Sequence, residues 1–218
     1  MKKAVIFDMD GVIVDTEPIY KEVNDDVYAK YGLEISEKEL ERYIGVNLIE
    51  TWKDIMERYE LNDDYKLNDI IEDHIYNYYK GLEASEELEL MSGLEEWFEY
   101  LKENDYKMII ASSSYEPIVE FIYQKFDLGK YMEGYVDGMQ VENGKPDPDI
   151  FLKALEKLGV AAEECLVIED SEHGVNAAKA AGIEVVAFDR REEAEQNLSN
   201  ADLIINEFNQ QNLHKIFN

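Results

Sequence analysis

Residues 4–17 read AVIFDMDGVIVDTE. This stretch begins with a short apolar run, typical of a buried strand, and then changes abruptly to acidic residues and glycine. If the backbone stays extended, Asp8 and Asp10 point the same way, because side chains two residues apart share one face of a strand. Gly11 then permits a sharp turn. We therefore expect two carboxylates side by side at the end of a strand.

Four further β-type apolar runs follow, at 107–112, 165–170, 184–188 and 202–205. Between them, apolar residues recur at helical spacing, as at Leu94, Trp97, Phe98 and Leu101. Strands that alternate with helices predict a parallel sheet with helices on both faces. The expected fold class is therefore α/β, with a Rossmann-like parallel sheet flanked by helices.

Residues 16–82 break this alternation, because apolar residues recur there at helical spacing without a strand-like run. We predict an all-helical cap domain over 16–82, inserted after the first strand and its loop. An α/β core domain is expected over 1–15 and 83–218. This insertion point places the cap over the carboxyl edge of the sheet.

The composition limits the classes of partner. The 218 residues include 50 Asp and Glu against 21 Lys and Arg, a formal net charge of -29. This charge repels nucleic acid and anionic membrane surfaces at long range, so we expect neither as a partner. The apolar run near the N-terminus is too short for a signal peptide or a membrane span, and we expect a cytoplasmic protein.

Polar residues follow several of the predicted strands, where ligands bind in open parallel sheets. At the first strand, one carboxylate of the Asp8 and Asp10 pair can serve as a nucleophile, while the other protonates the leaving oxygen and later activates water. Alone, such a pair is equally consistent with capping a turn. The hydroxyls and amides at 112–114 suit a phosphate at the start of a helix, or simply an N-cap.

Two more segments add to this pattern. Lys145, in GKPDPD at 144–149, stands just ahead of a predicted helix and can counter the charge of a transferring phosphoryl group, although a lone lysine is more typical of a solvated surface. Glu169 and Asp170 end the strand at 165–170 and suit magnesium, or an acid-rich helix start. The agreement of all these strand ends favours a phosphate-processing site.

The segments DMDGVIVDTE, ASSS, GKPDPDIF and VIEDSEHGVNAAKAAG resemble, in this order, the four motifs of the haloacid dehalogenase-like hydrolases. The resemblance spans nearly the whole chain, includes the cap, and is strongest to the β-phosphoglucomutase-like phosphatase branch. It implies that Asp8 forms an aspartyl-phosphate and that Asp10 acts as acid and base. It also implies that Ser112 and Lys145 hold the phosphoryl group.

The same resemblance implies a Mg²⁺ cofactor. Its protein ligands would be the Asp8 carboxylate, the main-chain carbonyl of Asp10, and Asp170. Glu169 would bind the metal directly or through water.

The resemblance also extends into the cap. The continuation DTEP at 15–18 resembles the sugar-phosphate phosphatases of this branch and is also typical of a helix start. We expect five residues to contact the substrate, and for each of them a structural role is the alternative: Thr16, Glu17, Gly45, Asn47 and Ser113.

Several functions are compatible with these residues. The first is a phosphatase acting on a small phosphorylated metabolite, a sugar phosphate above all. The second is a β-phosphoglucomutase, which is weakened because Tyr20 and the stretch 45–50 stand where that family would show a histidine and an arginine. The order of the motifs disfavours a receiver-like phospho-acceptor module. A dehalogenase is also disfavoured, because displacing a halide does not require the acid that Asp10 supplies.

The remaining expectations concern assembly and the histidines. A capped hydrolase with its active site between its own domains needs no partner, so we expect a monomer. The 3 histidines lack metal-ligand spacing, and we interpret them as surface or packing residues.

Overall fold

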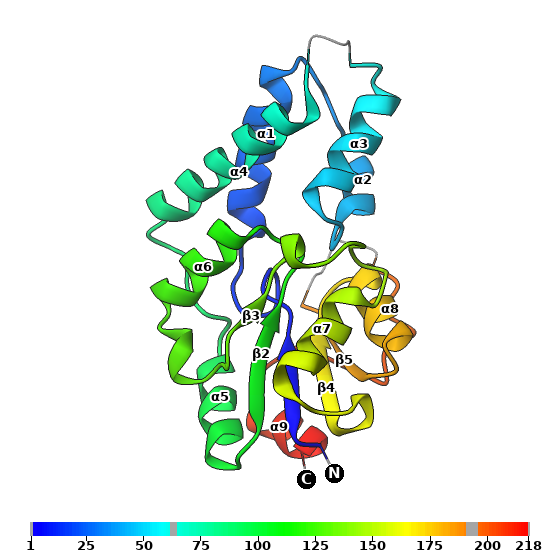
Figure 1. Cartoon of the computed structure of the whole chain (residues 1–218). Coiled ribbons are helices and arrows are strands. Elements are labelled where there is room, and N and C mark those ends of the chain that lie inside the picture. The colour runs from blue at the N-terminus through cyan, green and yellow to red at the C-terminus, as the bar shows by residue number, and fades with distance from the viewer. Residues whose placement is uncertain (1, 62–64, 191–195, 218) are drawn as a thin grey trace.

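The computed structural model describes residues 2–61, 65–190 and 196–217. Within these ranges six strands form one parallel sheet in the order β3-β2-β1-β4-β5-β6 (Figure 1). The strands are β1 (Ala4–Phe7), β2 (Lys107–Ala111), β3 (Tyr135–Val136), β4 (Cys165–Glu169), β5 (Glu184–Phe188) and β6 (Leu203–Ile205).

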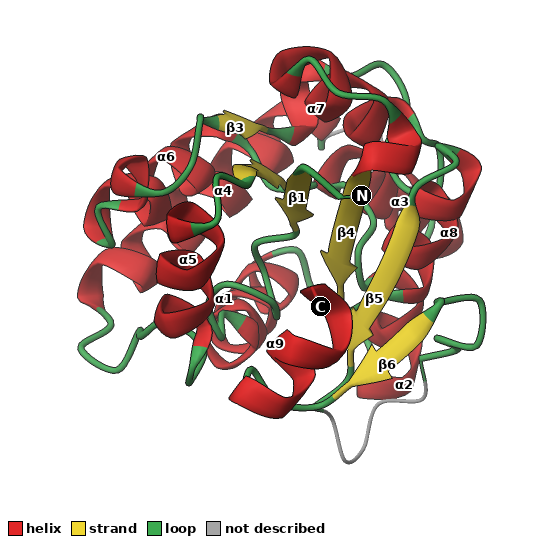
Figure 2. Cartoon of the chain, turned by 90° about the horizontal axis from the view of Figure 1, so that it is seen from below, coloured by secondary structure: helices red, strands yellow, loops and turns green. Residues whose placement is uncertain are grey.

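Helices cover both faces of the sheet (Figure 2). Alternate side chains of β1 enter two separate hydrophobic clusters, with Val5 and Phe7 in one and Ala4 and Ile6 in the other. The first cluster includes residues of α5 (Leu94–Glu103), α6 (Glu116–Lys125) and α9 (Gln210–Phe217). The second includes residues of α7 (Asp149–Leu158) and α8 (Glu172–Ala180).

The sheet confirms the predicted α/β fold class and all five predicted strands. β3 was not predicted, because its two residues are too few to show a periodic pattern. Short 3₁₀ helices complete this part of the fold: η2 (Leu128–Lys130), η3 (Gly138–Gln140) and η4 (Ala162–Glu164).

Between β1 and α5 the described residues form helices and no named strand, as the fold class with a helical cap requires. Figure 1 shows these helices at the end of the sheet where β1 and β2 end. They are α1 (Glu17–Lys30), α2 (Glu37–Leu40), η1 (Glu41–Tyr43), α3 (Leu48–Arg58) and α4 (Leu67–Ala84). The domain boundaries at 15/16 and 82/83 stay a prediction, and α4 itself continues to Ala84.

Trp52 joins the helices of the cap to one another. Its ring on α3 lies 5.4 Å from the ring of Tyr28 on α1, and its indole Nε1 donates a hydrogen bond of 3.0 Å to Nδ1 of His74 on α4. Both Trp52 and His74 are buried. The described part of the chain contains no helix with the length and apolar character needed to cross a membrane.

Candidate active site

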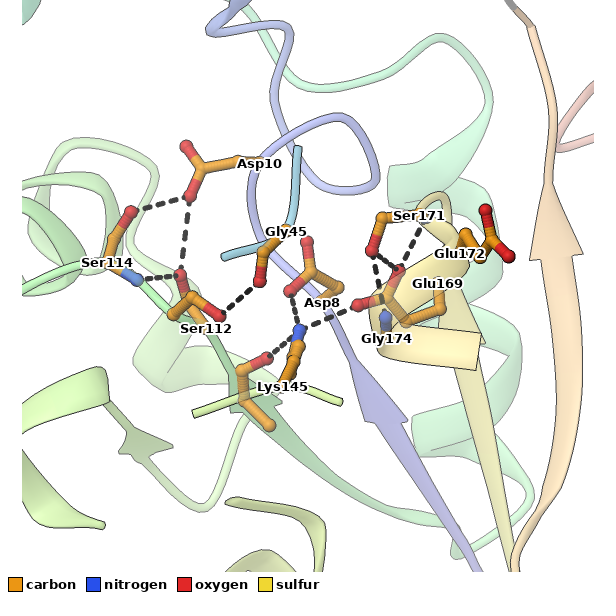
Figure 3. Close-up of polar contacts among 12 residues, drawn as sticks. Asp8, Asp10, Gly45, Ser112, Ser114, Lys145, Glu169, Ser171, Glu172 and Gly174 are labelled. Carbon is orange, nitrogen blue, oxygen red and sulfur yellow. Dashed lines mark hydrogen bonds and ion pairs between the residues drawn. The ribbon is translucent and has the colours of Figure 1, made fainter. Parts of the chain in front are cut away.

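A buried lysine lies between two carboxylates at the carboxyl edge of the sheet (Figure 3). Nζ of Lys145 donates to Oδ1 of Asp8 at 2.5 Å and to Oε1 of Glu169 at 2.6 Å. Asp8 follows β1, Glu169 ends β4, and Lys145 precedes α7. Lys145 is only 1% exposed and Asp8 5%, so this contact is shielded from solvent.

The strand register explains why distant segments converge here. Phe7, the last residue of β1, pairs with Ile110 of β2 on one side and with Ile168 of β4 on the other. The residues that follow these three strands must therefore meet at one edge of the sheet. Asp8, Ser112 and Asp170 come from those three positions.

Negative charge exceeds positive charge in this buried cluster. Burial raises the pKa of Asp8 well above its usual range, Lys145 acts in the opposite direction, and Glu169, Asp170 and Asp10 raise it further. For Lys145, burial alone lowers the pKa of the ammonium group, but the carboxylates of Asp8 and Glu169 raise it above its usual value. One lysine thus faces several carboxylates, an imbalance that a divalent cation would relieve.

The oxygen donors of this cluster fit magnesium. A Cβ on Gly11 would lie 2.1 Å from Oδ2 of Asp170, so the absence of a side chain at Gly11 lets that carboxylate approach the loop after β1. Asp8, Asp170 and the main-chain carbonyl of Asp10 are the groups that could hold the ion. In the described residues no set of three or more His, Cys, Asp or Glu side chains forms a metal cluster.

Both carboxylate oxygens of Glu169 are engaged by protein donors. Oε1 accepts from Lys145, while Oε2 accepts from the backbone N–H of Ser171 at 2.7 Å and from its hydroxyl at 3.0 Å. A Cβ on Gly174 would lie 1.6 Å from Oε1, so α8 also packs closely against this carboxylate. These contacts favour a role for Glu169 in holding Lys145.

Hydroxyl groups from several segments hold the carboxylate of Asp10. Thr16 and Tyr78 donate to Oδ1 at 2.7 and 3.2 Å. Ser114 and Ser112 donate to Oδ2 at 2.8 and 3.3 Å. Asp10 is thereby fixed beside Asp8 without an ion pair of its own among the contacts described. From the sequence, the hydroxyls at 112–114 were expected to bind a phosphate or to cap a helix, not to hold Asp10, and Tyr78 was not singled out.

A cavity of about 510 Å³ lies between the core and the cap. Its wall includes Asp8, Asp10 and Asp170, and also four of the predicted substrate-contacting residues: Thr16, Glu17, Gly45 and Ser113. Lys145 and Ser112 do not line the cavity; both are buried beside it.

The fifth predicted substrate-contacting residue, Asn47, does not line the cavity. Its side chain accepts a hydrogen bond of 3.0 Å from the backbone N–H of Glu50 and so caps α3. Close by, the hydroxyl of Ser113 donates to the carbonyl of Gly45 at 3.0 Å, which joins the cap to the core. The substrate contacts of all these residues stay predictions.

His74 is buried and lines the cavity. Burial lowers the pKa of its imidazole to about 4, because a charged ring would lose its hydration there. At neutral pH the ring is therefore uncharged.

We expect His74 to make the fold less stable as the pH falls from about 6.5 to about 4. The unfolded chain protonates this imidazole at its ordinary pKa, whereas the folded chain does so only near a pKa of about 4. The resulting loss reaches about 3 kcal/mol at the lower end of this range. A His74→Asn variant, which keeps an acceptor for Trp52, should lack this part of the pH dependence. Urea unfolding of both proteins across this range checks it; a stability difference that does not vary with pH would contradict it.

Comparison with known proteins gives consistent matches. The family described as haloacid dehalogenase-like hydrolase matches residues 5–188. A phosphorylated carbohydrates phosphatase of Thermotoga maritima is 40% identical over 182 residues, which cover 84% of this chain and 82% of that protein. A fructose-1-phosphate phosphatase of Escherichia coli is 30% identical over 186 residues, covering 84% and 94%.

A solved structure extends the match to the fold as a whole. The crystal structure of a β-phosphoglucomutase from Clostridium difficile superimposes with a TM-score of 0.85 at 25% identity, and the alignment covers 100% of this chain and 99% of that one. The similarity therefore includes both the sheet and the helices α1 to α4.

Proposed function

We propose that this chain, which belongs to the haloacid dehalogenase-like hydrolases and is a phosphoric monoester hydrolase, is a magnesium-dependent phosphatase of small sugar phosphates. The observation that carries the mechanism is the contact between Asp8 and the buried Lys145, next to Asp10, whose carboxylate accepts hydrogen bonds from four hydroxyls. The relatives named above support the substrate class, because their names specify phosphorylated carbohydrates.

In the first half of the reaction, an oxygen of Asp8 attacks phosphorus and the bond from phosphorus to the ester oxygen breaks. Asp10, in its protonated form, gives its proton to the departing ester oxygen, which leaves as an alcohol. An aspartyl-phosphate on Asp8 is the product. The hydroxyls of Thr16 and Tyr78 on one oxygen of Asp10, and those of Ser112 and Ser114 on the other, hold its carboxyl group in position.

In the second half, the Asp10 carboxylate takes a proton from water, whose oxygen attacks phosphorus. The bond between phosphorus and Asp8 breaks, inorganic phosphate is released, and Asp8 is regenerated. Lys145 stays charged and counters the negative charge on the phosphoryl oxygens in both halves. When bound by Asp8, Asp170 and the carbonyl of Asp10, magnesium supplies further positive charge at the phosphoryl group.

A single chain provides all of these groups, so we propose that the monomer suffices for activity. The contact from Ser113 to Gly45 supports closure of the cap on the core, which would exclude bulk water during turnover.

We expect phosphate release from sugar monophosphates that depends on added Mg²⁺. The assay compares sugar phosphates and nucleotides with and without the ion, and runs β-glucose 1-phosphate in parallel to detect glucose 6-phosphate. Release that requires Mg²⁺, and is stronger for sugar phosphates than for nucleotides, supports the proposal. Formation of glucose 6-phosphate without release would identify a mutase instead, and equal release with and without the ion would contradict the magnesium assignment.

A further inference from the structure

Among the described residues that line the cavity, three have a buried side-chain atom without a hydrogen-bond partner. One is the hydroxyl of Tyr115, which precedes α6 of the core; the two on the cap are Nε2 of His74 and Oδ1 of Asn24. Both residues line the cavity, and they are only 1% and 5% exposed. Unpartnered polar groups at this depth are uncommon and destabilise the protein that contains them. A ligand with complementary groups would satisfy them.

The hydrogen-bonding character of each atom follows from its surroundings. Nδ1 of His74 accepts the indole N–H of Trp52 at 3.0 Å, so the proton of the neutral ring is on Nε2, which is a donor. Oδ1 of Asn24 is an acceptor. The two residues lie on α4 and α1, which pack against each other, and the ring of Tyr20 lies 5.6 Å from that of His74. One donor and one acceptor are therefore offered by the same side of the cap.

Hydroxyl groups match these two atoms, because a hydroxyl can accept a hydrogen bond from Nε2 of His74 and can donate one to Oδ1 of Asn24. An ionised phosphate offers acceptors alone and would leave the acceptor of Asn24 without a partner. The charges of the wall point the same way: in the described residues the cap side of the cavity has the carboxylates of Glu17, Asp25 and Glu41 and the ammonium group of Lys21. Excess negative charge there disfavours a second phosphoryl group.

We propose that Asn24 and His74 form a subsite for the uncharged, hydroxyl-bearing end of the substrate, and that they select sugar monophosphates over sugar bisphosphates. This inference rests on the proposed function and names the part of the substrate that lies away from the phosphoryl group. It gives His74, interpreted from the sequence as a surface or packing residue, a role in specificity.

The test measures kcat/KM of the whole chain with Mg²⁺ for three substrates: a sugar monophosphate, the corresponding bisphosphate, and p-nitrophenyl phosphate, whose leaving group has no further hydroxyl. Asn24→Leu removes the acceptor, and His74→Asn removes the Nε2 donor while keeping an acceptor for Trp52. His74→Gln places an amide N–H near the position of Nε2. Asn77→Leu is the matched control, since Asn77 lies on α4 but does not line the cavity.

We expect wild type to prefer the monophosphate over the bisphosphate. Asn24→Leu and His74→Asn should each lower kcat/KM for the sugar monophosphate about 10-fold, the effect of one lost hydrogen bond, and change that for p-nitrophenyl phosphate less than about 2-fold. His74→Gln should retain most of the preference for the sugar monophosphate over the bisphosphate, and Asn77→Leu should retain all of it.

An equal loss on both monoesters, or a wild-type preference for the bisphosphate, would overturn the subsite while leaving the phosphatase intact. Absence of phosphate release from every substrate would overturn the proposed function, and the subsite with it. Thermal melting of each variant separates these outcomes from misfolding, because Asn24→Leu removes an unsatisfied atom and should not lower the melting temperature.

Discussion

Replacing Asp8 by asparagine should reduce phosphate release to background. The substitution keeps the size of the side chain but removes the anionic oxygen that attacks phosphorus. Lys145 retains its second partner, Glu169, at 2.6 Å, so the buried ammonium group is not left unpaired. Loss of activity should therefore occur without loss of the fold. The measurement is release of phosphate from the best sugar monophosphate with saturating Mg²⁺, together with thermal melting.

Asp202→Asn is the matched control for this variant. Asp202 pairs with Lys179 at 2.8 Å in an exposed ion pair remote from the cavity, and such pairs contribute little to stability. Its asparagine can still accept the hydrogen bond from the backbone N–H of Val185. This control should retain normal turnover, whereas near-normal activity of Asp8→Asn would rule out Asp8 as the nucleophile.

The Asp10→Asn variant should lose about 10²–10⁴-fold in turnover, the usual contribution of a positioned general acid and base. Asparagine is similar in size and can remain among the hydroxyls of Thr16, Tyr78 and Ser114, but it cannot deliver a proton to the leaving oxygen. Binding of Mg²⁺ should survive, because the proposed ligand at this position is the main-chain carbonyl.

Two measurements check this prediction. Steady-state kinetics gives the loss in turnover, and calorimetric titration with Mg²⁺ gives the metal affinity of wild type and variant. If the substitution abolished metal binding, the ligand would be the side chain and the acid and base would have to be sought elsewhere.

Much of the fold was predictable because its strands are short runs of apolar residues separated by strongly periodic helices. The sheet edge as a site followed from the same pattern, since the polar residues stand directly after the runs. The order of the strands was not readable from the sequence, and the structure supplies it: β1 lies between β2 and β4, which brings Asp8 next to both Ser112 and Asp170.

The residues that were missed depend on contacts between the cap and the core or between different helices of the cap. Tyr78 donates to Asp10 although 68 positions separate them, and its helical spacing in the sequence is that of an ordinary packing residue. His74 gave no signal either, because its environment is created by Trp52 on another helix. Asn47 shows the converse case, in which a polar residue expected to contact the substrate caps a helix outside the cavity wall.

Glu169 illustrates what a motif alone leaves open. From the sequence it was a metal ligand, direct or through water. In the structure both of its oxygens accept hydrogen bonds, from Lys145 on one side and Ser171 on the other. We therefore propose that it acts chiefly by holding Lys145, with any contact to magnesium made through water.

The central claim is that the phosphoryl group passes through Asp8, and it can be tested by trapping the enzyme during turnover. Acid quenching of the enzyme with Mg²⁺ and a sugar monophosphate, reduction with borohydride and peptide mass spectrometry would locate an acyl phosphate as homoserine. We expect this conversion at residue 8, with residue 10 unchanged, and no conversion in the Asp8→Asn variant. Two results would contradict this expectation. One is conversion at another residue, and the other is no conversion in an active enzyme that was quenched while its phosphorylated state was populated.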